Sequence, residues 1–204
     1  MSATQQRELA GRLAVTDPKR ALATAQAIED PWFACQALAW VARFAPDDQF
    51  LRIIKESLGA GQKATDPYRI VAAAAWPIRA IVEREHTRML PSVLPELLLL
   101  AKDIDLLVSR SEALFLLFQA VFPAGREYWF PALQSLREAS TPLVHWRQRR
   151  NLGDTVLIVW NEDAQLAAEM IDGFDDPKVK KQIEKAIVAS KRRFPRRFFW
   201  TTAA

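Results

Sequence analysis

The dipeptide Asp-Pro recurs along this chain of 204 residues, and it constrains the fold more than any other feature. It stands at Asp17-Pro18, Asp30-Pro31, Asp66-Pro67 and Asp176-Pro177, and Thr141-Pro142 is a close relative. An aspartate or threonine in this position accepts a hydrogen bond from a free N–H at the start of a helix. Proline suits the first helical position, because its missing N–H would have no partner there. Each pair therefore predicts the start of an α-helix.

The spacing of these pairs predicts a repeat. Asp30 and Asp66 are 36 residues apart, and the last two pairs are 35 residues apart. Asp103 lies near the middle of the remaining gap and marks a degraded copy, because isoleucine follows it. Periods of this length are typical of helical pairs stacked in an array. We expect an all-α fold: a right-handed α–α superhelix (α-solenoid) of about five helical pairs, as one domain over residues 1–204.

A second helix is predicted in front of each of these starts, over residues 20–28, 48–58, 91–102, 128–139 and 162–171. Glycine or proline marks most of the junctions, at Gly59, Gly61, Pro91, Gly125 and Gly173. With a helix at the N-terminus, these pairs predict about eleven helices and no strand. We expect Pro77 to kink or split its helix, because it removes one backbone hydrogen bond.

Two columns of side chains emerge when successive copies are aligned at an offset of 36 residues. In the first, Trp40 pairs with Trp76, and Leu116 follows in the third copy. Aromatic residues at helical spacing predict packing between layers of helices, with a ligand platform as the alternative.

The second column is polar and contains Arg43, Arg79 and Gln119. Equivalent positions of stacked repeats line up on one face, so the arginines predict a basic ladder that binds an acidic peptide or a phosphate. The alternative is a solvated face, or arginines that pair with nearby Glu83 and Asp47.

A family resemblance follows from the first copy. The pattern Leu22-Ala23, Ala27-Ile28 and Asp30-Pro31, followed by Gln36-Ala37-Leu38-Ala39 and Val41-Ala42, resembles the degenerate helical repeats of HEAT- and armadillo-like bacterial proteins. It extends over roughly residues 17–190. The tetratricopeptide pattern fits less well, because its tryptophan-leucine-glycine-tyrosine signature is absent. The resemblance implies a binding scaffold with a concave face and no particular chemistry.

The positive charge lies at the C-terminal end. Residues 177–204 hold nine lysines and arginines against one glutamate, a net charge of +8, so residues 1–176 contribute −4 to the total of +4. The basic, aromatic C-terminal tail, residues 191–204, supplies the candidate binding residues Lys191, Arg192, Arg193, Arg196, Arg197 and Trp200. Cations neutralise phosphates, and aromatic rings stack on bases or enter a lipid interface. The alternative is that Phe198, Phe199 and Trp200 fold back as a cap over the open end of the array.

The densest internal basic cluster spans residues 145–150, His-Trp-Arg-Gln-Arg-Arg. Arg147, Arg149 and Arg150 are candidate binding residues, because arginine holds phosphate through two hydrogen bonds and Trp146 can stack on a base. The alternative is a solvated charged face on which Arg150 pairs with Asp154.

Few residues suit catalysis or metal binding. The single cysteine, Cys35, excludes an intramolecular disulfide and is expected to be a small core residue. With two histidines and no phosphate loop or nucleophile motif, we expect no metal and no cofactor. Some DNA glycosylases for alkylated bases have a HEAT-like fold with tryptophan and aspartate near the lesion, and Trp160 with Asp163 is the matching pair here.

The sequence therefore predicts a non-catalytic helical-repeat scaffold that binds a protein partner. A nucleic-acid-binding protein that uses the basic C-terminal segment is the alternative, and a glycosylase is a more distant one. The most apolar run, residues 113–124, is shorter than the roughly twenty residues that span a bilayer. Because the N-terminus also lacks the apolar stretch of a signal peptide, we expect a cytoplasmic protein without a transmembrane segment.

Overall fold

The computed structural model describes residues 1–141, 143–188 and 199–200. These residues form eleven α-helices, three short 3-10 helices and no strand, which confirms the all-α prediction. The α-helices are α1 (Ala3–Thr16), α2 (Pro18–Gln26), α3 (Pro31–Ala42), α4 (Asp47–Gln62), α5 (Pro67–Glu83), α6 (Leu90–Leu100), α7 (Leu107–Val121), α8 (Arg126–Ala139), α9 (Trp146–Trp160), α10 (Ala164–Asp172) and α11 (Pro177–Val188). The 3-10 helices are η1 (Thr87–Met89), η2 (Ala101–Asp103) and η3 (Phe122–Ala124).

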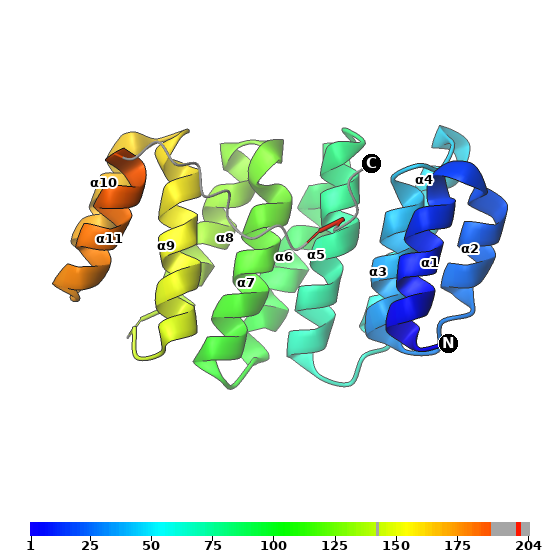
Figure 1. Ribbon diagram of the computed structural model, residues 1–204, viewed down its shortest axis with the longest axis horizontal. Coiled ribbons are helices and arrows are strands. Elements are labelled where there is room, and N and C mark those ends of the chain that lie inside the picture. Colours follow the sequence, from blue (N-terminus) through cyan, green and yellow to red (C-terminus); the bar gives the residue numbers. More distant parts are fainter. Residues whose placement is uncertain (142, 189–198, 201–204) are drawn as a thin grey trace.

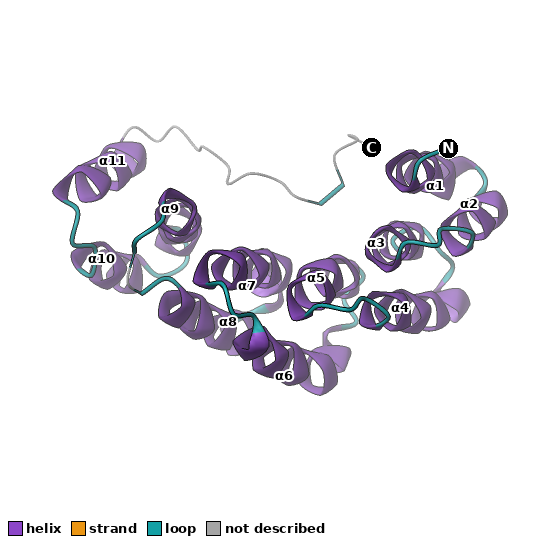
Figure 2. Cartoon of the chain, turned by 90° about the horizontal axis from the view of Figure 1, so that it is seen from below, coloured by secondary structure: helices purple, strands orange, loops and turns teal. Residues whose placement is uncertain are grey.

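The helices follow one another side by side along the long axis of the molecule (Figure 1), and they form two rows that follow an arc (Figure 2). Figure 2 shows the odd-numbered helices on the inner, concave side and the even-numbered helices on the outer side. Neighbouring inner helices contact one another from α1 to α11, and α3 and α7 each also pack against the outer helix that follows them. Residues that repeat on successive inner helices therefore lie side by side on the concave side.

All four Asp-Pro pairs begin helices with the expected cap. The carboxylates of Asp17, Asp30 and Asp66 accept hydrogen bonds from N–H groups in the first turns of α2, α3 and α5. The carboxylate of Asp176 caps α11 in the same way, accepting a hydrogen bond from the N–H of Lys178 at 2.9 Å. Arg69 Nη2 lies 2.9 and 3.0 Å from the two carboxylate oxygens of Asp30, so the starts of α3 and α5 are also tied to each other.

Two predicted helix starts are wrong. α9 begins at Trp146 rather than at Thr141, because His145 and Gln148 form a reciprocal capping box there. The Thr141 hydroxyl donates to the carbonyl of Arg137 in α8, and Pro142 lies outside the described residues. Asp103 ends η2, and α7 begins only at Leu107.

Glycine and proline also interrupt the helices less than we expected. α4 continues to Gln62 through Gly59 and Gly61. Gly61 is a close-packing position, since a Cβ there would lie 3.1 Å from Cys35 Sγ. Pro77 does not split α5, which runs unbroken between its packing partners α3 and α7. The packing on both sides offsets the hydrogen bond that the proline cannot make.

The most apolar run is a helix of the core. Within the described residues, one window, Leu107–Ala124, meets the length and composition of a membrane span, and half of it is buried inside the structure. It consists of α7 and η3, and both Phe115 and Phe118 are fully buried. Cys35 is buried as well, and burial raises the pKa of its thiol to about 12, which confirms a core role.

Gly11→Ala and Gly59→Ala make a matched pair of substitutions. A Cβ on Gly11 would lie 2.6 Å from ring atoms of the buried Trp40, whereas no atom lies within 4 Å of one on Gly59. Alanine within a helix is worth about 0.5–1 kcal/mol over glycine, and overpacking costs about 1–3 kcal/mol. In urea unfolding we expect Gly59→Ala to raise the free energy of unfolding by about 0.5–1 kcal/mol. Gly11→Ala should lower it by about 1 kcal/mol, and an increase would contradict the packing of Trp40 on α1.

Asp30 makes stability depend on pH. Burial acts to raise the pKa of its carboxyl, but the hydrogen bonds from Arg69, Phe33 and Trp32 and the charge of Arg69 outweigh it, so the pKa falls below 3.8. The ionised carboxylate therefore stabilises the fold above about pH 4, and this is lost as the pH falls through the lowered pKa. Asp30→Asn keeps a capping side chain but removes the charge. We expect it to unfold at lower urea concentration than the wild type at pH 7, with a smaller difference at pH 3; an equal difference would contradict this assignment.

Candidate functional site

The tryptophan column lies on the inner row of helices. Trp40 of α3 and Trp76 of α5 have ring centroids 6.1 Å apart. Trp40 is 2% exposed, Trp76 is 6% exposed, and Leu116 of α7 is 7% exposed. The column therefore packs between helices as predicted. The alternative, a ligand platform, stays a prediction.

Two residues from the far end of the chain complete this aromatic cluster. The Trp200 ring lies 5.7 Å from that of Trp40 and 5.0 Å from that of Trp76, with the latter pair edge to face. Phe199 also packs edge-on against Trp76, at 5.6 Å. Figure 2 shows this segment on the concave side of the arc, near α5.

The cap that we considered for the open end of the array is therefore wrong for Phe199 and Trp200. Trp200 packs against Trp40 of α3 and Trp76 of α5, and Phe199 packs against Trp76, because these rings offer an apolar surface on the inner row. Of the candidate residues in the tail, Trp200 is described. The others, Lys191, Arg192, Arg193, Arg196 and Arg197, and also Phe198, lie outside the described residues.

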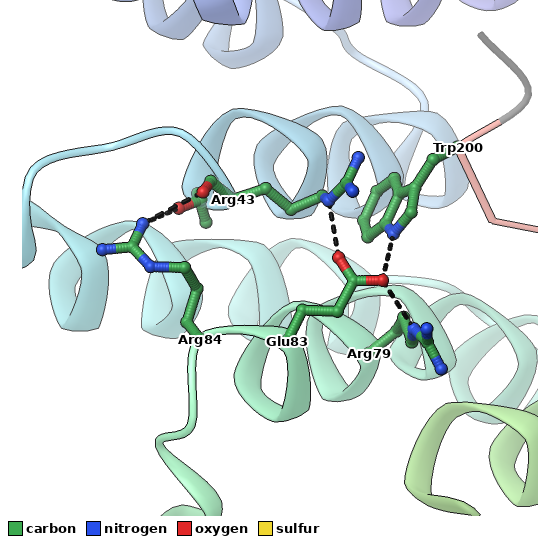
Figure 3. A network of polar contacts seen from close by, with 6 residues as sticks. Arg43, Arg79, Glu83, Arg84 and Trp200 are labelled. Atoms are coloured by element: carbon green, nitrogen blue, oxygen red, sulfur yellow. Dashed lines mark hydrogen bonds and ion pairs between the residues drawn. The ribbon is translucent and has the colours of Figure 1, made fainter. Parts of the chain in front are cut away.

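Glu83 joins the arginine column to Trp200 (Figure 3). Its Oε2 accepts a hydrogen bond from Arg43 Nε at 2.7 Å, and its Oε1 accepts one from Arg79 Nε at 2.7 Å. The same Oε1 accepts a hydrogen bond from the indole Nε1 of Trp200 at 3.0 Å. Arg43 Cζ lies 4.4 Å from the centre of the Trp200 ring, in cation–π contact. We call Trp40, Trp76, Arg43 and Glu83 the indole seat.

The arginine column thus follows the alternative in which Arg43 and Arg79 pair with Glu83. Asp47 pairs with Arg84 instead. Arg79 Nη1 also reaches the backbone carbonyl of Gln119 at 3.5 Å, so the column extends toward α7. The three positions that the repeat aligns are neighbours in space.

The end of α5 fixes this geometry. Arg84 is the C-cap, and Glu85 adopts a left-handed φ of 59°. The next N–H, of His86, bonds back to Ile81 at 2.9 Å, and together with the Glu85 N–H bond to Val82 this ends the helix in a Schellman motif. The Arg84 guanidinium then donates to carbonyls at the end of α3, those of Ala42, Arg43 and Ala45. The ends of α3 and α5 are held together, so Arg43 lies within reach of Glu83.

Sequence reasoning missed Arg7 of α1. Its Nη1 donates to Gln36 Oε1 at 2.6 Å, and its Cζ lies 5.7 Å from the centre of the Trp76 ring. The side chain therefore borders the aromatic cluster on the side of α1. No sequence signal points to it, because α1 lies outside the repeat that aligns Arg43 with Arg79.

The basic cluster at residues 145–150 is a separate surface on α9. Trp146 is 56% exposed, with Arg147 Cζ and Arg150 Cζ at 5.5 and 4.8 Å from its ring. Arg149 is held by the protein, through Asp176 at 3.5 Å and the carbonyl of Leu143 at 3.1 Å. Since α7 stands between α5 and α9 in the inner row, this cluster does not join the indole seat (Figure 2).

Asp163, the aspartate considered for base excision, has a structural role. It is the N-cap of α10, where it accepts a hydrogen bond from the Leu166 N–H at 2.9 Å, and it also pairs with Arg126. These contacts lower the pKa of its carboxyl. No group of three or more histidine, cysteine, aspartate or glutamate side chains within the described part of the chain is arranged to hold a metal ion.

A double-mutant cycle tests the charge network of the indole seat. The side chains of Arg43 and Glu83 are each 22% exposed, whereas Arg52 and Glu56 of α4, 3.7 Å apart, are 56 and 35% exposed. We expect a coupling free energy of about 1 kcal/mol between Arg43→Ala and Glu83→Ala in urea unfolding. The cycle at Arg52 and Glu56 is the control, with an expected coupling of about 0.3–0.5 kcal/mol. Equal coupling in both cycles would show that the inner network contributes no more than a surface pair.

The arrangement suits the recognition of an aromatic side chain that carries an N–H donor. The ring meets two tryptophans and a guanidinium, and the donor meets a carboxylate that two arginines keep in place.

Comparison of this chain with protein-family models, with curated proteins and with solved structures found no match.

Proposed function

We propose that this protein is a non-catalytic helical-repeat scaffold that binds a protein partner on its inner face. In this proposal the helical pairs form a right-handed α–α superhelix of about five repeats, similar to those of HEAT- and armadillo-like proteins. Such arrays use the concave side as an extended binding surface. The cytoplasmic location remains a prediction.

One observation carries the proposal: the inner face already binds a segment of polypeptide. Trp200 is 117 residues away from Glu83 in sequence, yet its indole N–H is bound by that carboxylate and its ring by Trp40, Trp76 and Arg43. Tryptophan and arginine are the residue types that contribute most to binding energy at protein interfaces. A surface that holds one segment of chain in this way suits a segment of another protein.

A second candidate, nucleic-acid binding, draws support from the cluster on α9. Trp146 is more than half exposed, and two guanidinium groups, of Arg147 and Arg150, contact its ring. An exposed ring of this kind can stack on a base, while the arginines neutralise phosphates. The basic tail adds charge of the same sign.

Selection from a displayed library of random peptides, with the full chain as bait, tests the protein-binding proposal. Selected peptides are then titrated against Arg43→Glu and against Arg52→Glu, which makes the same charge change on the outer helix α4. We expect Arg43→Glu to weaken binding at least about tenfold and Arg52→Glu to leave it unchanged, because the first disrupts the inner-face network. Circular dichroism confirms that both variants are folded.

Two outcomes would count against protein binding: a selection that yields no peptide, or peptides equally weakened by both substitutions. A fluorescent single-stranded oligonucleotide provides the second arm. Steeply salt-dependent binding that Trp146→Ala weakens, together with a failed selection, would favour the nucleic-acid candidate.

A further inference from the structure

We propose that the indole seat recognises a tryptophan side chain presented by the partner, and that the chain's own Trp200 occupies the seat until the partner displaces it. This inference rests on the proposed function and specifies its partner: a protein segment with an accessible tryptophan. Three properties of the seat support it: the fit of the ring, the recognition of the N–H, and the ease with which Trp200 is displaced.

The ring is held on several sides. Trp76 meets the Trp200 ring edge to face at 86°, Trp40 meets it at 52°, and the Arg43 guanidinium lies 4.4 Å from its centre. Aromatic contacts and cation–π contacts of this kind favour large, electron-rich rings, and tryptophan is the best of the side chains in this respect. The seat is therefore suited to an indole in size and in electrostatics.

The N–H group supplies specificity. Glu83 accepts it at 3.0 Å while both its oxygens remain bonded to Arg43 and Arg79. A carboxylate has about four acceptor sites, so the indole bond needs no ion pair to break. Phenylalanine has no donor for Glu83, so it lacks the hydrogen bond that the indole N–H makes. The seat thus distinguishes tryptophan from other apolar aromatic side chains.

Trp200 is bound under strain, which makes it replaceable. Its backbone has a φ of 54°, in the left-handed region that bulky residues rarely adopt. The contacts of the indole compensate for this conformation, and the cost reduces the net affinity of the intramolecular contact. A tryptophan on a partner segment with an ordinary backbone reaches the same contacts without that cost. Trp40 and Trp76 keep an indole as a neighbour in either state.

The experiment uses the full chain and a labelled host peptide, Gly-Ser-Gly-Ser-Trp-Gly-Ser-Gly-Ser, with binding measured by fluorescence anisotropy. Two further peptides replace the tryptophan by phenylalanine or by 1-methyltryptophan, which keeps the indole ring but lacks the N–H. Three proteins are compared: the wild type, the variant Trp200→Ala and the variant Trp146→Ala. Trp200→Ala vacates the seat, and Trp146→Ala removes the exposed tryptophan of α9 as a control.

We expect the tryptophan peptide to bind Trp200→Ala at least about tenfold more tightly than the wild type or Trp146→Ala, because no internal competitor remains. On Trp200→Ala, the phenylalanine and 1-methyltryptophan peptides should each bind about tenfold more weakly than the tryptophan peptide. These probes alter the ligand and leave Glu83 intact, so the test of the hydrogen bond does not depend on how a seat variant folds.

Three results would overturn the inference: no binding of the tryptophan peptide to Trp200→Ala, equal affinity for the tryptophan and 1-methyltryptophan peptides, or no effect of Trp200→Ala on affinity. The proposed function fails separately. If the library selection yields inner-face peptides without tryptophan, the scaffold role stands and this inference falls. If the selection yields no binder while the tryptophan peptide binds the vacated seat, recognition of tryptophan by the seat stands and the scaffold role falls.

Discussion

The structure depends on the stacking of its inner helices, above all α3, α5 and α7. Every residue of α3 from Ala34 onward is buried, and α5 and α7 have similarly long buried stretches. A helix that is apolar on several sides cannot be covered by one partner and needs neighbours on more than one. Each inner helix therefore packs against the inner helices beside it as well as against outer ones. This arrangement aligns equivalent residues of successive pairs.

The indole seat is a direct consequence of that alignment. Arg43 and Arg79 occupy equivalent positions, and the carboxylate between them, Glu83, follows Arg79 by one helical turn. Two guanidinium groups fix the orientation of the carboxylate without exhausting its capacity to accept hydrogen bonds. The result is a preorganised acceptor beside a pair of tryptophans, which is an efficient way to bind a side chain that is both aromatic and a donor.

Particular residues show where prediction from the sequence succeeds. The Asp-Pro pairs predict helix starts correctly because the cap and the proline act within one turn, as at Asp30 and Asp66. Pairing of the column arginines with Glu83 is predictable because Glu83 lies four residues after Arg79, whereas its bond to Arg43 depends on the stacking of α3 against α5. The failures are at Thr141, where His145 supplies the cap instead, and at Gly61 and Pro77, where packing keeps a helix intact. At Gly61 and Pro77 a contact outside the local segment outweighs the local preference, whereas at Thr141 a second local cap, a few residues later, replaces the predicted one.

By itself, the sequence determined the helical class and the two columns of tryptophan and arginine. Helix capping and apolar periodicity are local and depend on residues a few positions apart. Only the tertiary structure decided that Phe199 and Trp200 lie on Trp40 and Trp76, and that Arg7 borders the same cluster. These contacts join segments outside the repeat to segments within it. No periodicity encodes them, since they arise from surfaces that exist only once the inner helices are stacked.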